Sequence, residues 1–206
     1  MIPYRYPFAE EFKHSLPDRN GSVGRYEYIG NDACTCSRFI DVYELCMEEV
    51  RMRISIGNDH CGFPLKQTVL DLLEALGHEV IDHGCHSEDP VDFPDIVEGV
   101  CRSIQEQEAD RGLLLCGSGI GACMAANKMQ GIRAALNHDI HCAHQSVEHD
   151  DANVMCIGAK IVGPWLAADL IQAFLEAEFF NHDPDRVRRV DKLNRMDANL
   201  GSVCVR

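Results

Sequence analysis

The stretch of sequence that decides the fold spans residues 111–128 and reads Arg-Gly-Leu-Leu-Leu-Cys-Gly-Ser-Gly-Ile-Gly-Ala-Cys-Met-Ala-Ala-Asn-Lys. Its apolar run, 113–115, is typical of a strand that is buried on both faces of a sheet. The glycine-rich residues 117–121 allow a tight turn into a helix, and the first free N–H groups of such a helix favour a negatively charged ligand. The stretch therefore predicts a strand, a loop suited to an anion, and a helix.

Cys116 is the chemically reactive residue of this stretch, and it stands where the strand meets the loop. A helix N-terminus and nearby cations lower the pKa of a thiol, which makes Cys116 a candidate base or nucleophile. The alternative is a buried cysteine that packs as a small apolar residue. The loop is not a Walker loop, because no Gly-Lys-Ser/Thr closes it, and its G-x-G-x-G spacing differs from the dinucleotide-binding fingerprint.

Short apolar runs and segments with helical periodicity alternate on both sides of this stretch. The predicted strands cover 54–57, 78–82, 112–115, 131–136 and 153–158, and the predicted helices cover 64–76, 95–107, 119–129, 139–148, a long segment from 163 onward, and 184–199. This alternation predicts an α/β fold: a doubly wound, Rossmann-like, five-stranded parallel sheet with helices on both faces and an added C-terminal helix. Residues 1–51 lack sustained periodicity, so we expect an N-terminal extension, 1–51, followed by one domain, 52–206.

Composition excludes several classes of partner. The formal net charge of -14 argues against nucleic acid or an anionic membrane, since both require a basic face. No apolar run is long enough to span a bilayer, and the first 30 residues lack the pattern of a secretory signal, which favours the cytoplasm. The 11 cysteines contain no C-x-x-C pair, so scattered reduced thiols are expected rather than disulfides or a structural metal. Four histidines share a helix-like spacing and keep metal binding open as an alternative, although we predict neither metal nor cofactor: His138, His141, His144 and His149.

Three groups of polar residues flank predicted strands and are expected to converge at the carboxyl ends of the sheet. They are Asp59-His60 after the first strand, residues 116–121 after the third, and the segment around His149 before the fifth. A carboxylate, a thiol, an anion-binding loop and an imidazole are the groups needed to move a proton beside a carbonyl and to stabilise an enediolate.

From about Arg53 onward, the chain resembles ribose-5-phosphate isomerase type B and the related galactose-6-phosphate isomerase subunits. The resemblance is carried by Gly57-Asn58-Asp59-His60-Cys61-Gly62, Asp92-Phe93-Pro94, Cys116-Gly117-Ser118-Gly119-Ile120-Gly121, Ala125-Ala126-Asn127-Lys128 with Gly131-Ile132-Arg133-Ala134, and residues 149–153. It implies reversible aldose–ketose isomerisation of a phosphorylated sugar without metal or organic cofactor. It further implies a homodimer, or a dimer of dimers, in which two subunits share each site.

The resemblance also implies a role for individual residues. Cys116 would be the base that moves a proton between C1 and C2, His149 would help to open the furanose ring, and Asp59 would bind or shuttle hydroxyl protons. Ser118 would support the reacting oxygens. The implied substrate-binding residues are His60, Gly117, Gly119, Gly121, Asp150, Asn153, Lys160, Arg186 and Arg189. A subgroup of the family uses a glutamate after the glycine loop; this chain has Ala122 there and keeps Cys116, as the cysteine users do.

Three departures from the family pattern concern the substrate. Asp150 stands where the family has asparagine, and Lys160 replaces an arginine, so a cation remains without bidentate geometry. In the terminal segment the first phosphate arginine falls on Asp185, with Arg186 one place later, while Arg189 is kept. The leading substrate is ribose 5-phosphate. Alternatives are another sugar, such as galactose 6-phosphate or a tetrose phosphate, a non-catalytic sugar-phosphate-binding subunit of a mixed assembly, and a thiol redox protein.

Overall fold

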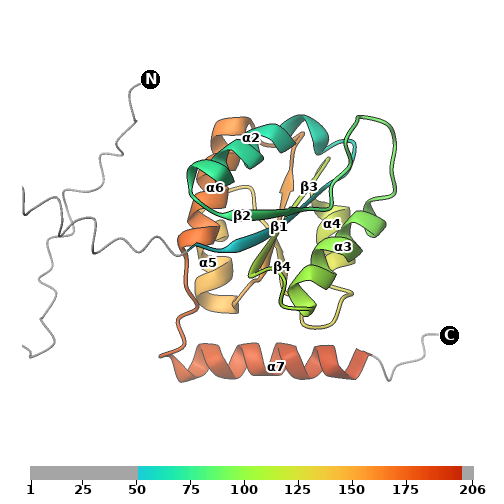
Figure 1. Ribbon diagram of the computed structural model, residues 1–206. Coiled ribbons are helices and arrows are strands. Elements are labelled where there is room, and N and C mark those ends of the chain that lie inside the picture. The colour runs from blue at the N-terminus through green and yellow to red at the C-terminus, as the bar shows by residue number, and fades with distance from the viewer. Residues whose placement is uncertain (1–50, 201–206) are drawn as a thin grey trace, which may run out of the picture. The chain divides into compact units, whose positions relative to one another are not determined.

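The computed structural model describes residues 51–200, so that nearly all of the predicted N-terminal extension lies outside the described part (Figure 1). Five strands alternate with helices along this part of the chain. The elements are β1 (Arg53–Asn58), α2 (Phe63–Ala75), β2 (Glu79–Asp82), α3 (Phe93–Gln105), β3 (Arg111–Cys116), α4 (Ile120–Ala126), β4 (Ala134–Leu136), α5 (Ile140–Asp150), β5 (Val154–Gly158), α6 (Pro164–Glu176) and α7 (Pro184–Leu200).

All strand pairs are parallel, and the strands lie in the order β2-β1-β3-β5-β4. Each crossover therefore carries the chain over the sheet in a helix, as Figure 1 shows. β2 lies on one side of β1, whereas β3, β5 and β4 lie on its other side. The switch point of the sheet thus lies between β1 and β3, which is where open α/β sheets place their ligands. The predicted doubly wound fold is confirmed.

The core consists of two hydrophobic layers, one on each face of the sheet. Leu113 and Leu115 of β3 pack with α2, α5 and α6, whereas Leu114 packs with α3 and α4 on the opposite face. All three side chains are at most 1% exposed. Because successive side chains of a strand point to opposite faces, a continuous apolar run is what a doubly covered strand requires.

Several element boundaries differ from the prediction, and the differences have local causes. Helix α3 begins at Phe93 because Pro94 takes the first-turn position, where its missing N–H is harmless. Strand β4 was expected from 131 but begins at Ala134, since Gly131 has φ of 77° and the Arg133 N–H bonds to the Asn153 side chain. Helix α4 ends at Ala126 rather than 129, because the N–H groups of Lys128 and Met129 bond to carbonyls three residues earlier instead of four.

Helix α7 follows α6 and contacts the rest of the domain through hydrogen bonds to the segment before β4. The Asp197 carboxylate accepts a 2.5 Å hydrogen bond from the Gly131 N–H, and Arg133 donates to Asn194 at 3.5 Å. Val190 is buried, yet Leu193 and Met196 on the next turns stay 43% and 66% exposed. Among residues 51–200, no helix is long and apolar enough to cross a membrane.

Candidate active site

Asp59 and Cys116 meet at the carboxyl edge of the sheet, the edge where the strands end. β1 and β3 are neighbours, and the Asp59 N–H donates to the Leu115 carbonyl at 3.1 Å. The Asp59 carboxylate, 6% exposed, accepts the Gly62 N–H at 2.8 Å at the start of α2. The two predicted groups that follow β1 and β3 therefore do come together, at the switch point.

The Cys116 thiol is half-buried beside this carboxylate. Burial is the main cause that raises the pKa of Cys116 above its ordinary value, and the hydrogen bond with Asp59 and its negative charge add to the rise. The N–H groups of Gly119 and Gly117 act in the opposite direction and favour the thiolate. Because burial and Asp59 together outweigh the two N–H groups, the pKa of Cys116 is raised and the thiol is protonated at neutral pH. The Asp59 carboxylate next to it can accept the proton, and the two N–H groups can stabilise the thiolate.

The glycine loop owes its shape to close packing. Gly119 has φ of 76°, and a Cβ there would lie 2.5 Å from the Leu136 side chain. A Cβ on Gly121 would lie 2.9 Å from the ring of Phe93. Ser118 is half-buried, and its hydroxyl accepts a long, 3.5 Å hydrogen bond from the Ile120 N–H. Positions 119 and 121 therefore have no room for a side chain beyond glycine.

Lys160 supplies a cation at the same edge. The backbone N–H of Lys160 donates to the Gly117 carbonyl at 3.0 Å, which holds the segment after β5 against the glycine loop. A hydrogen bond with Cys61 is the main cause that raises the pKa of Lys160, and the charge of Asp59 contributes. His60 accepts the Val91 N–H at 3.3 Å and so fixes the loop before α3. We call Asp59, Cys116, residues 117–121 and Lys160 the Cys116 site.

His149 lies at the opposite edge of the sheet, and the expectation that it joins Cys116 within one chain is wrong. Helix α5 runs against the strands and ends at Asp150, just before β5 begins. Val154 is level with Gly112, and from Gly112 to Cys116 the strand rises about 13 Å at roughly 3.3 Å per residue. A segment that precedes a strand lies at its amino end, whereas the segments after β1 and β3 lie at their carboxyl ends.

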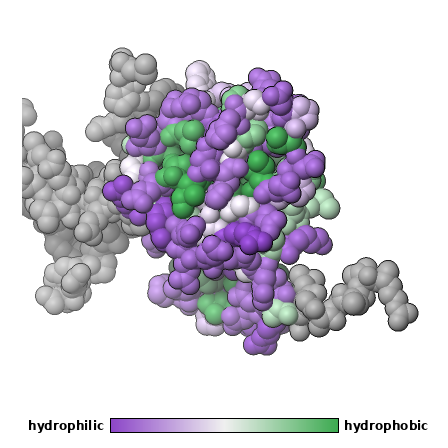
Figure 2. All heavy atoms as spheres, turned by 45° about the vertical axis from the view of Figure 1, so that its right-hand side comes forward, coloured by the Kyte–Doolittle hydropathy of each residue, from purple (hydrophilic) through white to green (hydrophobic). Residues whose placement is uncertain are grey.

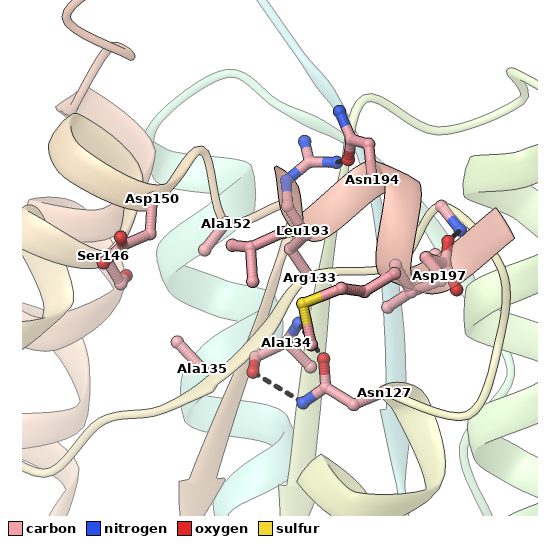
Figure 3. Close-up of a pocket in the computed structure, with 13 residues that line it drawn as sticks. Asn127, Arg133, Ala134, Ala135, Ser146, Asp150, Ala152, Leu193, Asn194 and Asp197 are labelled. Carbon is pink, nitrogen blue, oxygen red and sulfur yellow. Dashed lines mark hydrogen bonds between the residues drawn. The ribbon is translucent and has the colours of Figure 1, made fainter. Parts of the chain in front are cut away.

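The remaining predicted ligands also lie at this amino edge. Asn153 is committed to the backbone, since its side chain accepts the Arg133 N–H and donates to the Gly131 carbonyl at 2.8 and 2.9 Å. Asp150 is exposed and lines a pocket of about 660 Å³ between α5, β4 and α7, in which Arg133 and Asn194 point toward one another (Figure 3). Arg189 is exposed on α7.

Arg186 is the predicted phosphate ligand with the most contacts at the amino edge. Its guanidinium lies 3.2 Å from Glu148 and 3.5 Å from Asp183, and it stacks over the Phe180 ring at 4.9 Å. The sequence prediction did not include Glu148. Its signal in the sequence was the spacing of four residues from His144 along one helix, and the two side chains lie 3.3 Å apart.

The alternatives of a metal site and of a redox site were also open. His138 accepts the Gly158 N–H at 3.0 Å, and the described residues contain no group of three or more side chains arranged to hold a metal ion. The cysteines within 51–200 are free thiols. A hydrogen bond with Cys156, a buried thiol of β5, lowers the pKa of Cys123 to about 7.

Comparison with known proteins identifies the family to which the chain belongs. Residues 54–193 match the model of a family described as ribose/galactose isomerase. The chain belongs to the ribose/galactose isomerase family. Membership makes it an aldose–ketose isomerase of sugar phosphates.

Relatives within this family carry different substrates in their names. The chain is 37% identical over 148 residues to a ribose-5-P isomerase B of Listeria innocua, covering 70% of this chain and 100% of the relative. It is 40% identical over 130 residues to a D-erythrulose-4-phosphate isomerase of Pectobacterium atrosepticum, covering 62% and 85%. The structure of Clostridium thermocellum ribose-5-phosphate isomerase B aligns with a TM-score of 0.69 and 40% identity, over 72% of this chain and 99% of the other.

Proposed function

We propose that this chain interconverts ribose 5-phosphate and ribulose 5-phosphate, with Cys116 as the base, at a site that two copies of the chain build together. The observation that carries the proposal is the Cys116 thiol beside Asp59 and the N–H groups of Gly117 and Gly119, at the switch point of the sheet. These are the groups that proton transfer next to a carbonyl requires.

The isomerisation follows from the positions of these groups. After ring opening, the Cys116 thiolate removes the proton from C2. The C–H electron pair forms the C1–C2 double bond of an enediolate, and the π pair of the C1 carbonyl moves onto O1. The N–H groups of the glycine loop stabilise the oxygen anion. The thiol then returns the proton to C1, and the carbonyl forms at C2. Asp59 accepts the thiol proton before the reaction and carries protons between the two sugar oxygens.

A second copy supplies what the Cys116 site lacks. His149 and Arg186 lie at the amino edge, about 13 Å of strand rise away from Cys116, so they cannot reach the thiol of their own chain. His149 of the partner subunit would open the ring, and Arg186 and Arg189 of the partner subunit would meet the phosphate with Lys160.

The surface offers apolar area for such a partner. Ile120 and Met124 on α4 are 53% and 63% exposed, and Ile140 at the start of α5 is 45% exposed. Hydrophobic patches interrupt the hydrophilic face seen in Figure 2. Burying large apolar side chains against a second copy contributes roughly 25 cal/mol per Å² to association. Cyclic symmetry would pair the amino edge of each copy with the carboxyl edge of the other.

Another sugar phosphate is the second candidate substrate. Lys160 provides a point charge where bidentate binding was expected, and the Asp185 carboxylate is paired with Arg188 at 2.5 Å. Because these predicted phosphate ligands differ from the family pattern, the substrate test should include sugar phosphates with carbon chains of several lengths. The panel should contain ribose 5-phosphate, galactose 6-phosphate and erythrose 4-phosphate.

The test follows ketose formation from this panel in D₂O, where exchange of the C2 proton reports the base directly. We expect ribose 5-phosphate to have the highest kcat/KM. Cys116→Ala should lower proton exchange by about a hundredfold or more with little change in substrate binding. The control is Cys142→Ala, which removes an exposed thiol from α5. Exchange in Cys116→Ala at the wild-type rate would contradict Cys116 as base, and turnover only after addition of a second related chain would make this chain a subunit of a mixed assembly.

A further inference from the structure

A polar cluster surrounds Glu148 in the last turn of α5. The two oxygens of its carboxylate face different partners: one lies 3.2 Å from Arg186, and the other lies 3.3 Å from His144 and 4.0 Å from His149. The Glu148 carbonyl accepts the Phe180 N–H at 3.0 Å, which ties the segment before α7 to the end of α5. We call Glu148, His144, His149 and Arg186 the Glu148 cluster.

Arg186 is held in this cluster from three sides. Glu148 binds Nη1, Asp183 lies 3.5 Å from Nε, and the guanidinium stacks on the Phe180 ring. Its side chain is only 20% exposed, so the pair is partly shielded from solvent. Pairing with Arg186 is the main cause that lowers the pKa of Glu148, and the carboxylate is therefore charged at neutral pH.

Two carboxylates, those of Glu148 and Asp183, already face the one guanidinium to which a phosphate would have to bind. An incoming phosphate dianion must share the guanidinium with Glu148 or displace it, and like charges at short range repel. The neighbouring arginines face another carboxylate. Arg188 is paired with Asp185 at 2.5 Å, and the charge of Arg189 also acts on Asp185.

We infer that Glu148 is a specificity-determining residue, which competes with the substrate phosphate for Arg186 and so sets how tightly the site holds phosphorylated sugars. The inference rests on the proposed function, because it assumes that Arg186 of one copy serves the reaction centre of another. Phosphate affinity in this chain is then set by the carboxylate on α5 as much as by the arginine on α7. A neutral residue at 148 would release the full charge of the guanidinium to the substrate.

The test measures binding of inorganic phosphate to the full-length protein by titration calorimetry, which needs no turnover. We expect Glu148→Gln to lower the phosphate Kd by about five- to tenfold, as removal of one nearby like charge should. The matched control is Glu98→Gln, which breaks a glutamate–arginine pair with Arg102 on α3. It should leave the Kd unchanged. Glu148→Asp keeps the charge and should bind phosphate as the wild type does.

The double variant Glu148→Gln/Arg186→Ala identifies the residue through which Glu148 acts. It should lose the gain, because the released guanidinium is absent. An unchanged or higher phosphate Kd in Glu148→Gln would overturn the inference, as would a gain that persists without Arg186 or no detectable binding by either protein. Tighter phosphate binding by Glu148→Gln in a chain that turns over no sugar phosphate would leave the role of Glu148 intact and refute only the proposed reaction.

Discussion

Mixing two inactive variants, Cys116→Ala and His149→Ala, tests whether two chains build each site. Cys116 ends β3, whereas His149 lies beyond the opposite end of the sheet, about 13 Å of strand rise away. If each site takes its thiol from one chain and its imidazole from the other, a mixed dimer has one site with both substitutions and one site with neither. Random exchange makes half of the dimers mixed, so activity should recover to about 25% of the wild type.

The assay is ketose formation after equal amounts of the two variants have been incubated until subunits exchange, with native mass spectrometry to confirm mixed dimers. Mixed dimers isolated with two different affinity tags should reach about 50% of the wild-type rate, because one of their two sites is intact. The control mixes Cys116→Ala with the double variant Cys116→Ala/His149→Ala. That mixture has no thiol at any site and should stay inactive. Absence of recovery in proven mixed dimers would refute the shared site.

Further predictions concern the loop, the thiol and the core. Gly119→Ala should lower the free energy of unfolding by about 2–4 kcal/mol in urea titrations, since positive φ and a 2.5 Å contact both oppose a Cβ, whereas Gly131→Ala, with positive φ but open space, should lose about 1–2 kcal/mol. A loss of equal size in both variants would contradict the packing argument. Asp59→Asn removes a charge that raises the pKa of Cys116, so the pH profile of Cys116 alkylation, followed by mass spectrometry, should move to lower pH; a shift to higher pH would exclude this coupling. Phe174→Ala should lower the free energy of unfolding by about 3–5 kcal/mol, because the side chain is 0% exposed, and a loss below 1 kcal/mol would show that the core refills the cavity.

Much of the fold could be predicted because its signals are local. The run 113–115 shows on its own that a strand is covered on both faces, since neighbouring side chains point to opposite layers. Proline and glycine mark the helix boundaries for steric reasons that operate within one turn. The shortened β4 was not predictable in this way, because its start depends on the Asn153 side chain, which reaches Arg133 from the start of the neighbouring strand.

Some residues of the candidate site could likewise be predicted from the sequence, and others could not. The order of amino acids was sufficient to identify a thiol at the end of a buried strand, the glycine loop behind it and the carboxylate after β1, because each follows a strand and must lie at the carboxyl edge. By the same rule His149, which precedes β5, belongs at the amino edge, a consequence that the sequence interpretation overlooked. The sequence could not show that Glu148 already holds Arg186, because these side chains lie 38 positions apart in the chain and 3.2 Å apart in space. Contacts over such separations arise only when the helices have packed.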